Sequence, residues 1–329
     1  MKIVLTGDLA ETLREETVDA LAGTGVDPEL VVLHADGRFD GDPAGCEVVH
    51  FCVSAARYEP AMRSLMPLFD EPALRWMQGP GAGIDNPIWE GLLSRGVRLT
   101  NASGIHGEPI AQYIFTYVLH WERNVARHQR QQADRHWEII HSGDLGAKTI
   151  GIVGYGGIGR ATAKIAKAFG MRTLGCRRSP CEDPNLDRYV PLDALSELLS
   201  ESDYVVLCMP FNDETRGMIG APELAAMRED AVLINVARGG VVDEPALIEG
   251  LRAGAIRGAT LDVVSEEPLP KDSPLWTLEN CVLTPHDAGY SPLGSRRLGS
   301  LFVDNLGRFV RGEPLRNEIL STGIAHAEG

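Results

Sequence analysis

The sequence of 329 residues lacks the cysteine pairs of a disulfide framework or a metal site. Its six cysteines stand at positions 46, 52, 176, 181, 208 and 281, without a Cys-x-x-Cys pair, and several lie in apolar runs. A thiol in such a run packs as a small hydrophobic side chain. We therefore expect reduced, structural cysteines and assign no residue to a metal.

Long apolar runs and excess positive charge are also missing. No run approaches the about 18 residues that a membrane-spanning helix needs, and MKIVLTGDLAET turns polar too early for a signal peptide. Lys and Arg number 31 against 46 Asp and Glu, which gives a net charge of −15. A diffuse negative field disfavours nucleic acid and anionic membranes as partners. We expect a cytoplasmic protein that binds a small ligand in a locally basic pocket.

The length is too great for one ordinary core and favours two domains of roughly 150 residues each. Apolar, strand-like runs alternate with helical segments after residue 148, and the first hundred residues show the same rhythm in KIVLTG, LVVLHA, VVHFCVS, LRWMQGPGAG and VRLTNAS. Repeated alternation of strand and helix predicts two α/β units with doubly wound parallel sheets.

One glycine-rich turn lies where a strand meets a helix. Thr149–Val153 reads as a strand and runs into Gly-x-Gly-x-x-Gly before a helical segment. This order is typical of a dinucleotide-binding turn. The candidate cofactor ligands in the turn are Gly154, Tyr155, Gly156, Gly157, Ile158 and Gly159. We predict a Rossmann dinucleotide-binding domain at residues 104–291, inserted in a flavodoxin-like substrate domain formed by residues 1–103 and 292–329.

An acidic residue is missing about 20 residues after the glycines, where an NAD-selective site carries one. Arg177 and Arg178 stand there, followed by Ser179. An acid would repel a 2′-phosphate, whereas guanidinium groups offer it charge-assisted hydrogen bonds. We expect NADP to be preferred and NAD to be possible, unless the arginines only belong to a solvated turn before Pro180.

Three groups suited to the reduction of a 2-oxo acid follow three separate strand-like runs: Arg238, Glu267 and His286. The carboxyl ends of parallel strands share one edge, so we expect these side chains together beside the glycine turn. A guanidinium binds a carboxylate with two prongs, an imidazole that titrates near about pH 6.5 donates a proton, and a carboxylate fixes its tautomer. Taken singly, each residue also suits a salt bridge or a solvated loop, but their coincidence favours catalysis.

Four segments resemble, in order and spacing, the signatures of the D-isomer-specific 2-hydroxyacid dehydrogenases, and the likeness covers most of the chain. The segments are GIVGYGGIGRATAKIAKAFGM, INVARGGVVDEPALIEGLRAG, LDVVSEEPLPKDSPLW and VLTPHDAGY. The resemblance implies that Arg238 binds the substrate carboxylate, that Glu267 is the acidic partner and that His286 is the acid–base residue. These are the residues that the strand ends select.

The resemblance also implies further ligands. Asp262 would hold the nicotinamide carboxamide, and other cofactor contacts would come from Pro210, Thr215, Val236, Ala237, Ala288 and Gly289. The segments CVSAARY and GPGAGIDN look like substrate loops whose backbone N–H groups cradle a carboxylate, at Val53, Ser54, Gly81, Ala82 and Gly83. Turns needed only for folding are the alternative for these loops. The resemblance suggests a homodimer through the cofactor domain, and Trp137 either covers the substrate or simply packs.

Two positions depart from the family pattern. Gln112 replaces a glutamate in the long helical segment after residue 109, away from the chemistry. Asp287 follows the histidine directly, where many members carry a small or apolar residue, and it either favours the imidazolium of His286 or shapes the pocket mouth.

The sequence therefore predicts an NADP-preferring 2-oxo acid reductase that forms a D-2-hydroxy acid, with glyoxylate and hydroxypyruvate as substrates by resemblance. One alternative is an NAD-dependent member that acts on D-lactate or a phosphorylated acid. Another is a nucleotide-sensing binding protein like the corepressor members of the family.

Overall fold

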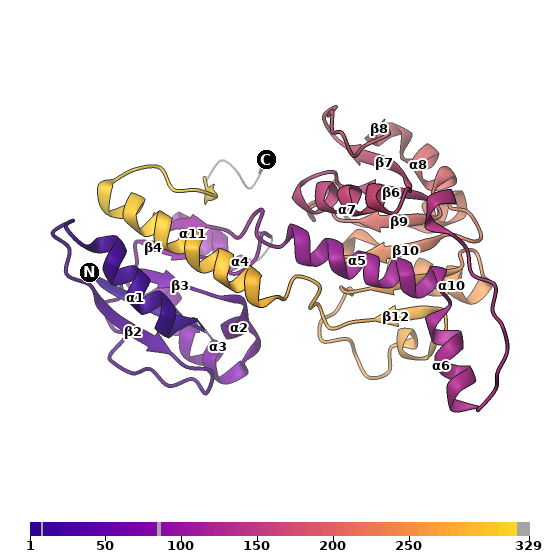
Figure 1. Ribbon diagram of the computed structural model, residues 1–329. Helices are drawn as coiled ribbons and strands as arrows, with labels where there is room; N and C mark the ends of the chain where they lie inside the picture. Colours follow the sequence, from indigo (N-terminus) through magenta and orange to yellow (C-terminus); the bar gives the residue numbers. More distant parts are fainter. Residues whose placement is uncertain (8, 84–86, 321–329) are drawn as a thin grey trace. The chain divides into compact units, whose positions relative to one another are not determined.

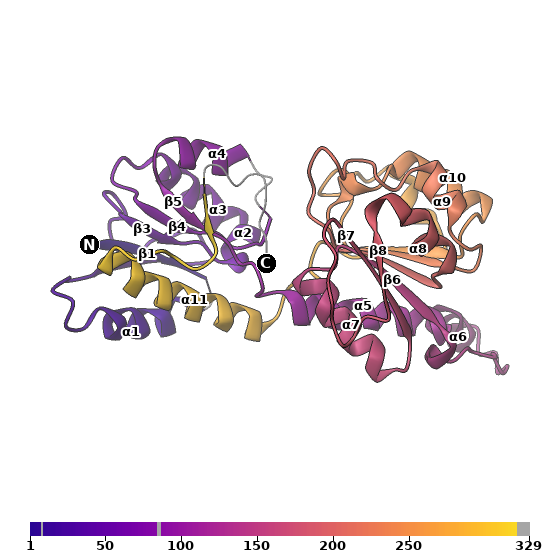
Figure 2. The same ribbon diagram turned by 90° about the horizontal axis from the view of Figure 1, so that it is seen from above.

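The computed structural model describes residues 1–7, 9–83 and 87–320, and the chain forms two compact units (Figure 1, Figure 2). Unit 1 comprises Met1–His106 and Tyr290–Gly329, and unit 2 comprises Gly107–Gly289. The units therefore divide at 106/107 and 289/290, whereas the sequence places the boundaries at 103/104 and 291/292. Within the described residues, no helix combines the length and the apolar character that crossing a membrane requires.

Unit 1 is built on a six-stranded sheet in the order β13-β5-β4-β3-β1-β2. Its strands are β1 (Lys2–Thr6), β2 (Glu29–Leu33), β3 (Val48–His50), β4 (Trp76–Gln78), β5 (Arg98–Thr100) and β13 (Glu318–Ile319). The five parallel strands follow the flavodoxin-like order, as the sequence predicts. The edge strand β13 runs antiparallel to β5 and was not expected, because two residues leave no periodic pattern.

Alternating side chains of the unit 1 strands serve two cores. Ile3 and Leu5 pack with Trp76 and Phe302 in one apolar cluster, whereas Val4 belongs to a second cluster on the other face of the sheet. The helices α1 (Ala10–Leu21) and α11 (Pro292–Arg311) pack against each other (Figure 2). The remaining helices are α2 (Val53–Arg57), α3 (Glu59–Leu65), α4 (Pro87–Ser94) and the 3-10 turn η1 (Met66–Asp70).

Unit 2 contains a seven-stranded, fully parallel sheet in the order β12-β11-β10-β9-β6-β7-β8 (Figure 1). Its strands are β6 (Thr149–Val153), β7 (Arg172–Arg177), β8 (Arg188–Pro191), β9 (Tyr204–Leu207), β10 (Val232–Asn235), β11 (Gly258–Leu261) and β12 (Cys281–Leu283). Six of them follow the order of the Rossmann fold, with β12 added at one edge. The apolar, strand-like runs of the sequence do not reveal β8, whose segment RYVP contains little apolar sequence.

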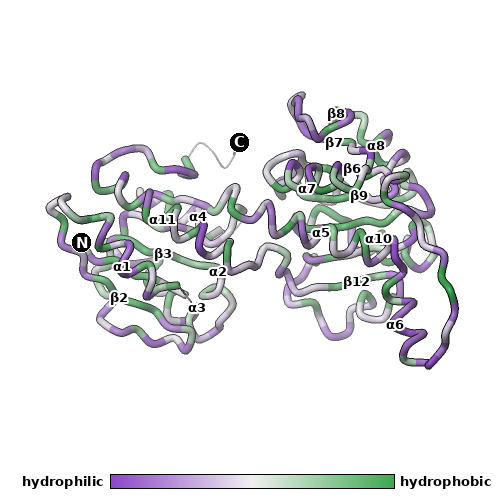
Figure 3. The backbone as a smooth tube through the Cα atoms, viewed as in Figure 1, coloured by the Kyte–Doolittle hydropathy of each residue, from purple (hydrophilic) through white to green (hydrophobic). Residues whose placement is uncertain are grey.

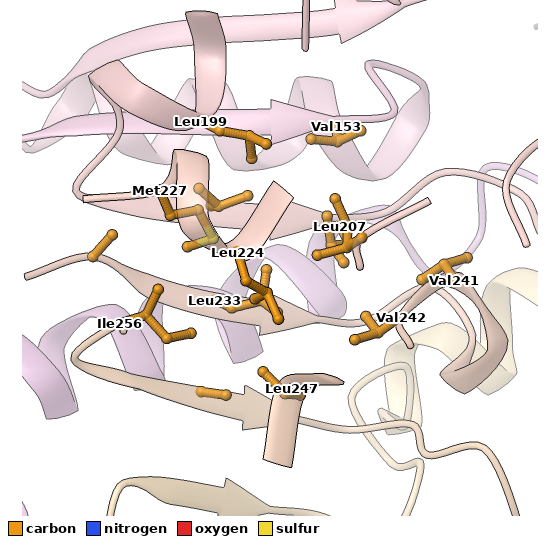
Figure 4. Packing of buried hydrophobic residues seen from close by; sticks show 14 of the residues in the cluster. Val153, Leu199, Leu207, Leu224, Met227, Leu233, Val241, Val242, Leu247 and Ile256 are labelled. Atoms are coloured by element: carbon orange, nitrogen blue, oxygen red, sulfur yellow. The ribbon is translucent and has the colours of Figure 1, made fainter. Parts of the chain in front are cut away.

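The inner strands β9, β10 and β11 are buried on both faces, which explains why they read as continuous apolar runs. Figure 4 shows side chains of β6, β9 and β10, such as Val153, Leu207 and Leu233, packed against the covering segments. The helices are α5 (Gly107–Glu122), α6 (Val125–Ala133), α7 (Gly157–Ala168), α8 (Leu195–Glu201), α9 (Ala221–Ala226) and α10 (Glu244–Ala253), with 3-10 turns η2 (Leu145–Ala147), η3 (Leu192–Ala194), η4 (Gly239–Val241) and η5 (Pro274–Thr277). Figure 3 shows that α6 is largely hydrophilic, in contrast to the sheet.

Candidate active site

The glycine turn joins the carboxyl end of β6 to α7, and the reason why a larger residue would not fit differs from one glycine to the next. Gly154 has φ +100°, and a Cβ there would lie 2.4 Å from the backbone nitrogen of Met209. A Cβ at Gly159 would lie 2.7 Å from the carbonyl oxygen of Gly154. At Gly156, by contrast, a Cβ would meet no atom within 4 Å. The fold therefore requires Gly154 and Gly159, while Gly156 leaves open space at the start of α7.

This open space fits a dinucleotide diphosphate. Gly156 is the N-cap of α7 and provides no side-chain cap, so the first N–H groups of the helix are available to an anion. Tyr155 does not face that space, because its side chain is 1% exposed and fills the volume over Gly175. Burial raises the pKa of Tyr155 above its ordinary value. The side chain of Tyr155 thus packs in the core, and the role of this residue as a cofactor ligand stays a prediction.

The loop after β9 lies beside the glycine turn and is held by its own side chains. The hydroxyl of Thr215 donates to the carbonyl oxygen of Pro210 at 2.8 Å and accepts from the N–H of Asn212 at 2.9 Å. The thiol of Cys208 donates to the carbonyl oxygen of Gly154 at 2.9 Å, and burial raises its pKa to about 12. Thr215 and Cys208 therefore shape the cofactor edge, and no sequence motif points to Cys208.

The arginine pair lies at the end of β7, where the sequence places it. The hydroxyl of Tyr189 donates to the carbonyl oxygen of Arg177 at 3.1 Å and fixes the backbone. Within the described part of the chain, no carboxylate lies within 4.0 Å of the Arg177 guanidinium, whereas Arg178 lies 3.8 Å from Glu214. Ser179 is exposed beside them.

The three catalytic candidates follow β10, β11 and β12, which are neighbours in the sheet. The Nδ1 of His286 lies 2.8 Å from the Oε2 of Glu267, and the N–H of Val264 donates to Glu267 Oε1 at 3.2 Å. Arg238 lies close enough for its charge to act on the Glu267 carboxylate. Before it, Val236 and Ala237 form a buried bend directly after β10. The structure thus brings all three candidates together at one edge of the sheet.

The electrostatics of the site keep Glu267 ionised. Burial raises the pKa of Glu267, but the hydrogen bond to His286, the His286 charge, the Val264 N–H and the Arg238 charge outweigh it, so the pKa is lowered. An ionised carboxylate against Nδ1 fixes the ring orientation and stabilises the imidazolium. The arrangement suits a histidine whose ring is oriented for proton transfer.

Asp262 holds the turn that presents His286. The backbone N–H of His286, which has φ +55°, donates to the carbonyl oxygen of Asp262 at 2.8 Å. Oδ1 of Asp262 accepts from the Thr284 hydroxyl at 2.7 Å and from the Asp287 N–H at 2.9 Å, and Oδ2 accepts from the Ala288 N–H at 3.1 Å. Asp262 therefore organises residues 284–288, which Gly289 follows. The resemblance implies a nicotinamide contact for Asp262 as well.

Sequence reasoning missed two side chains that support this site. Tyr113 on α5 contacts the Thr284 hydroxyl at 2.6 Å, and burial raises its pKa, which keeps the phenol protonated. Asn235 accepts from the Ala237 N–H at 3.1 Å and donates to the Arg238 carbonyl at 3.0 Å, so it clamps the turn that carries Arg238. Its signal was visible, because a polar residue ends the otherwise apolar strand VLIN.

The two departures from the family pattern take different places. Gln112 is exposed on α5, where its carbonyl oxygen accepts from the Thr116 hydroxyl. Asp287 uses its N–H in the turn, and its charge contributes to the raised pKa of Tyr113 and of Tyr117. Asp287 is thus part of the turn that presents His286.

The candidate substrate loops lie in unit 1, after β3 and β4. Val53 begins α2, and the Ser54 hydroxyl lies 3.2 Å from the Cys52 thiol. The carbonyl oxygen of Gly81 accepts from the Ala102 N–H at 2.9 Å. The carbonyl oxygen of Ala82 accepts from the Asn101 side-chain amide at 2.9 Å, which sequence reasoning did not anticipate. The loop continues through Gly83, and residues 84–86 of GPGAGIDN lie outside the described residues.

Trp137 does not pack inside its own chain. Its side chain is 98% exposed and that of Ile139 is 80% exposed, in the segment after α6. α6 itself buries no residue. The alternative that Trp137 is a packing residue within the chain is therefore wrong.

Comparisons with known proteins agree with this geometry. Residues 115–288 match the family described as D-isomer specific 2-hydroxyacid dehydrogenase, NAD binding domain. The chain is 39% identical over 251 residues to a glyoxylate reductase from Korarchaeum cryptofilum, covering 74% of this chain and 75% of the relative. A D-isomer specific 2-hydroxyacid dehydrogenase family protein from Aeromonas salmonicida superposes with a TM-score of 0.81 at 31% identity, covering 97% and 98% of the two chains. The structure of a D-isomer specific 2-hydroxyacid dehydrogenase from Xanthobacter autotrophicus Py2, in complex with NADPH and MES, gives a TM-score of 0.76 at 30% identity and covers 97% of each chain.

Proposed function

Because the chain belongs to the D-isomer specific 2-hydroxyacid dehydrogenases, NAD(P)-dependent oxidoreductases that act on a CH–OH group, we propose that it reduces a small 2-oxo acid with NADPH. The product is the D-2-hydroxy acid. The observation that carries the proposal is the 2.8 Å contact between His286 Nδ1 and Glu267, beside Arg238 and a glycine turn. A nucleotide-sensing binding protein would not itself require the complete trio of Arg238, Glu267 and His286.

The residues present fit a nicotinamide dinucleotide. The diphosphate would lie against the first amides of α7, over the open space at Gly156. Arg177 and Arg178 would bind the 2′-phosphate, and Asp262 would face the carboxamide. When bound, the reduced cofactor supplies the hydride that adds to the carbonyl carbon.

The catalytic trio divides the remaining work. Arg238 would hold the substrate carboxylate with two N–H groups and polarise the carbonyl oxygen. With Nδ1 of His286 engaged by Glu267, Nε2 is the nitrogen that delivers a proton to the oxygen as the C=O bond becomes C–OH. Glu267 stabilises the imidazolium before the transfer and orients the ring throughout.

Small substrates, glyoxylate and hydroxypyruvate, are the proposed oxo acids. The support is the identity to the glyoxylate reductase from Korarchaeum cryptofilum and the small residues Gly81, Ala82 and Gly83 after β4. The N–H groups of this loop and of Ser54 would contribute to carboxylate binding. The carbonyl oxygens of Gly81 and Ala82 accept hydrogen bonds from Ala102 and Asn101, which hold the loop in place.

A panel of oxo acids with both cofactors tests the proposal. Glyoxylate and hydroxypyruvate should turn over fastest among glyoxylate, hydroxypyruvate, pyruvate and 3-phosphohydroxypyruvate. NADPH should exceed NADH by about 10- to 100-fold in kcat/KM, if one guanidinium contact is worth roughly 1.5–3 kcal/mol. Arg177→Asp should erase or reverse that preference and leave NADH usable. Absence of turnover with all four acids would contradict the reductase, and a wild-type preference for NADH would contradict only the cofactor assignment.

A cytoplasmic homodimer is the proposed state of the enzyme. The six cysteines are free thiols, which suits a reducing compartment. α6 buries no residue, and Trp137 and Ile139 follow it almost fully exposed, so the segment 125–139 is a suitable surface for a second copy. Light scattering at micromolar concentration should give twice the chain mass, and Trp137→Asp should lower it. A wild-type mass of one chain would contradict the dimer.

A further inference from the structure

Arg178, which the proposed function assigns to the 2′-phosphate, has an acidic neighbour on the opposite loop. Its Nη1 lies 3.8 Å from the Oε2 of Glu214, and the two side chains are 52% and 68% exposed. Arg178 follows β7 and Glu214 follows β9, the strands on either side of β6 (Figure 1). The ion pair therefore spans the sheet edge at the strand that carries the glycine turn.

The backbone on both sides of this ion pair is fixed by hydrogen bonds. The N–H of Glu214 donates to the Asn212 side-chain oxygen at 3.0 Å, within the loop that the Thr215 hydroxyl closes. On the other side, the Tyr189 hydroxyl holds the carbonyl of Arg177. The backbone positions from which Arg178 and Glu214 extend are thus held by hydrogen bonds on both sides.

Among the acids of the loop after β7, Asp183 is already compensated. Asp183 lies 2.5 Å from the Nη1 of Arg160 on α7 and accepts the Asn185 N–H. Burial raises the pKa of Asp183, but these hydrogen bonds and the Arg160 charge outweigh it and lower the pKa. Among the described residues, Glu214 is the acid within ion-pair distance of Arg178, and none lies within that distance of Arg177.

We propose that Glu214 is a specificity-determining residue that weakens the binding of 2′-phosphorylated dinucleotides. A 2′-phosphate carries a charge of about −1.5 to −2 at pH 7 and requires the guanidinium that Glu214 already contacts. Binding must separate the pair, and the carboxylate then faces the phosphate as a like charge. A dinucleotide without the phosphate encounters neither cost. The inference rests on the proposed assignment of the arginine pair to the 2′-phosphate.

The expected size is modest because both side chains are exposed. An exposed ion pair and a screened like charge at this range together change affinity by about threefold to tenfold. The effect should shrink with added salt, since charges in solvent are screened beyond about 10 Å at 0.1 M.

Calorimetric titration with adenosine 2′,5′-bisphosphate and with 5′-AMP tests the inference without turnover. Glu214→Gln should lower the Kd of the bisphosphate by about threefold to tenfold and leave that of 5′-AMP unchanged. This improvement in affinity should become smaller as NaCl is raised from 50 mM to 500 mM. In an Arg178→Gln background, Glu214→Gln should produce a smaller gain.

Asp213→Asn is the matched control, because it removes the same charge from the adjacent position. The Asp213 side chain is 100% exposed and forms its ion pair with Arg216, at 3.6 Å, instead of with Arg178. It should change neither Kd. An equal fall in the Kd of the bisphosphate in Asp213→Asn would mean that net charge alone causes the effect, and this would overturn the inference. An unchanged Kd in Glu214→Gln would overturn it as well.

The outcomes also separate this inference from the proposed function. A Glu214→Gln gain in an enzyme that reduces none of the four oxo acids would contradict the reductase and leave the inference standing. Normal reduction of glyoxylate without a Glu214→Gln gain would overturn the inference alone. If neither the wild type nor Glu214→Gln binds the bisphosphate more tightly than 5′-AMP, the inference falls together with the NADP assignment.

Discussion

Unit 1 and unit 2 share a doubly wound parallel sheet but differ in the side chains at the carboxyl ends of their strands. In unit 2 the candidate site side chains follow the strand ends and are ionisable and partly exposed, as in the His286–Glu267 pair. In unit 1 they are neutral and buried: the hydroxyl of Thr100 at the end of β5 donates to the Oε1 of Gln78 at the end of β4. Under the proposed function, the same architecture would place the proton transfer in unit 2 and the shaping of the substrate loops in unit 1.

The two units also hold their functional loops by different means. In unit 2 the Asp262 carboxylate accepts two backbone N–H groups from the turn after His286. In unit 1 the neutral Asn101 amide donates to the loop after β4. Hydrogen bonds to charged groups are stronger than neutral ones. Loss of one bond should therefore cost more free energy in the turn after His286 than in the loop after β4.

The largest expected effect follows from His286→Asn in unit 2. Asparagine tolerates the φ of +55° at this position, so the backbone turn should persist while the proton donor is lost. We expect kcat for glyoxylate reduction to fall by about 10²- to 10⁴-fold, with the NADPH Kd unchanged. Steady-state kinetics and fluorescence titration of NADPH measure the two quantities.

His141→Asn is the control for this change, since His141 is exposed and lies outside both the proposed chemistry and the proposed dimer surface. It should leave kcat as in the wild type. A kcat within threefold of wild type in His286→Asn would remove unit 2 from the proton transfer and break the comparison between the two strand edges.

Arg238→Lys should have the next largest effect, although it keeps the charge. A lysine ammonium cannot reproduce the two-pronged contact with a carboxylate, so kcat/KM should fall by about 10- to 100-fold. Arg252→Lys provides the control, because Arg252 pairs with Glu249 on the surface of α10. Unchanged kcat/KM in Arg238→Lys would mean that the unit 1 loops hold the carboxylate without it.

Unit 1 should reveal its buried, neutral character through the pH dependence of its stability. His50 is 2% exposed, neither ring nitrogen has a hydrogen-bond partner among the described residues, and burial lowers its pKa to about 4. Unfolded histidine titrates near about 6.5, so the folded unit binds fewer protons and loses stability as pH falls from about 6.5 to 4. Between pH 7 and pH 5 the free energy of unfolding should fall by about 2 kcal/mol through this residue.

His50→Leu tests this expectation. Hydrogen exchange of the β1 and β3 amides, corrected for intrinsic rates, reports unit 1 without unit 2. His50→Leu should reduce the pH-dependent loss, because it removes an unpaired polar group from an apolar site beside Phe302. His34→Asn, at an exposed position of the same unit, should retain it. A wild-type pH dependence in His50→Leu would assign the loss to other groups.

Much of this comparison could be predicted from the sequence, and the rest depends on packing. The Gly-x-Gly-x-x-Gly turn and the residues that follow apolar strands were readable, because a parallel sheet brings strand ends to one edge. The buried position of the Tyr155 side chain could not be read, since a turn position gives no sign that a side chain points into the core. Tyr113, Asn101 and Glu214 were not found, because their partners are remote in sequence and only the fold brings them together.

The smallest expected effect concerns Asn101, whose amide donates to the Ala82 carbonyl oxygen at 2.9 Å. Asn101→Ala removes this neutral hydrogen bond, worth about 1 kcal/mol, together with the one that Asn101 Oδ1 accepts from the Ser103 N–H at 3.0 Å, and lets the loop after β4 drift. We expect KM for glyoxylate to rise about fivefold, with kcat and the KM for NADPH unchanged, because unit 2 keeps its charged groups. Ser103→Ala on the same turn removes an exposed hydroxyl and should change nothing. A fall in kcat without a change in KM would show that unit 1 takes part in the chemical step, which the neutral side chains at its strand ends argue against.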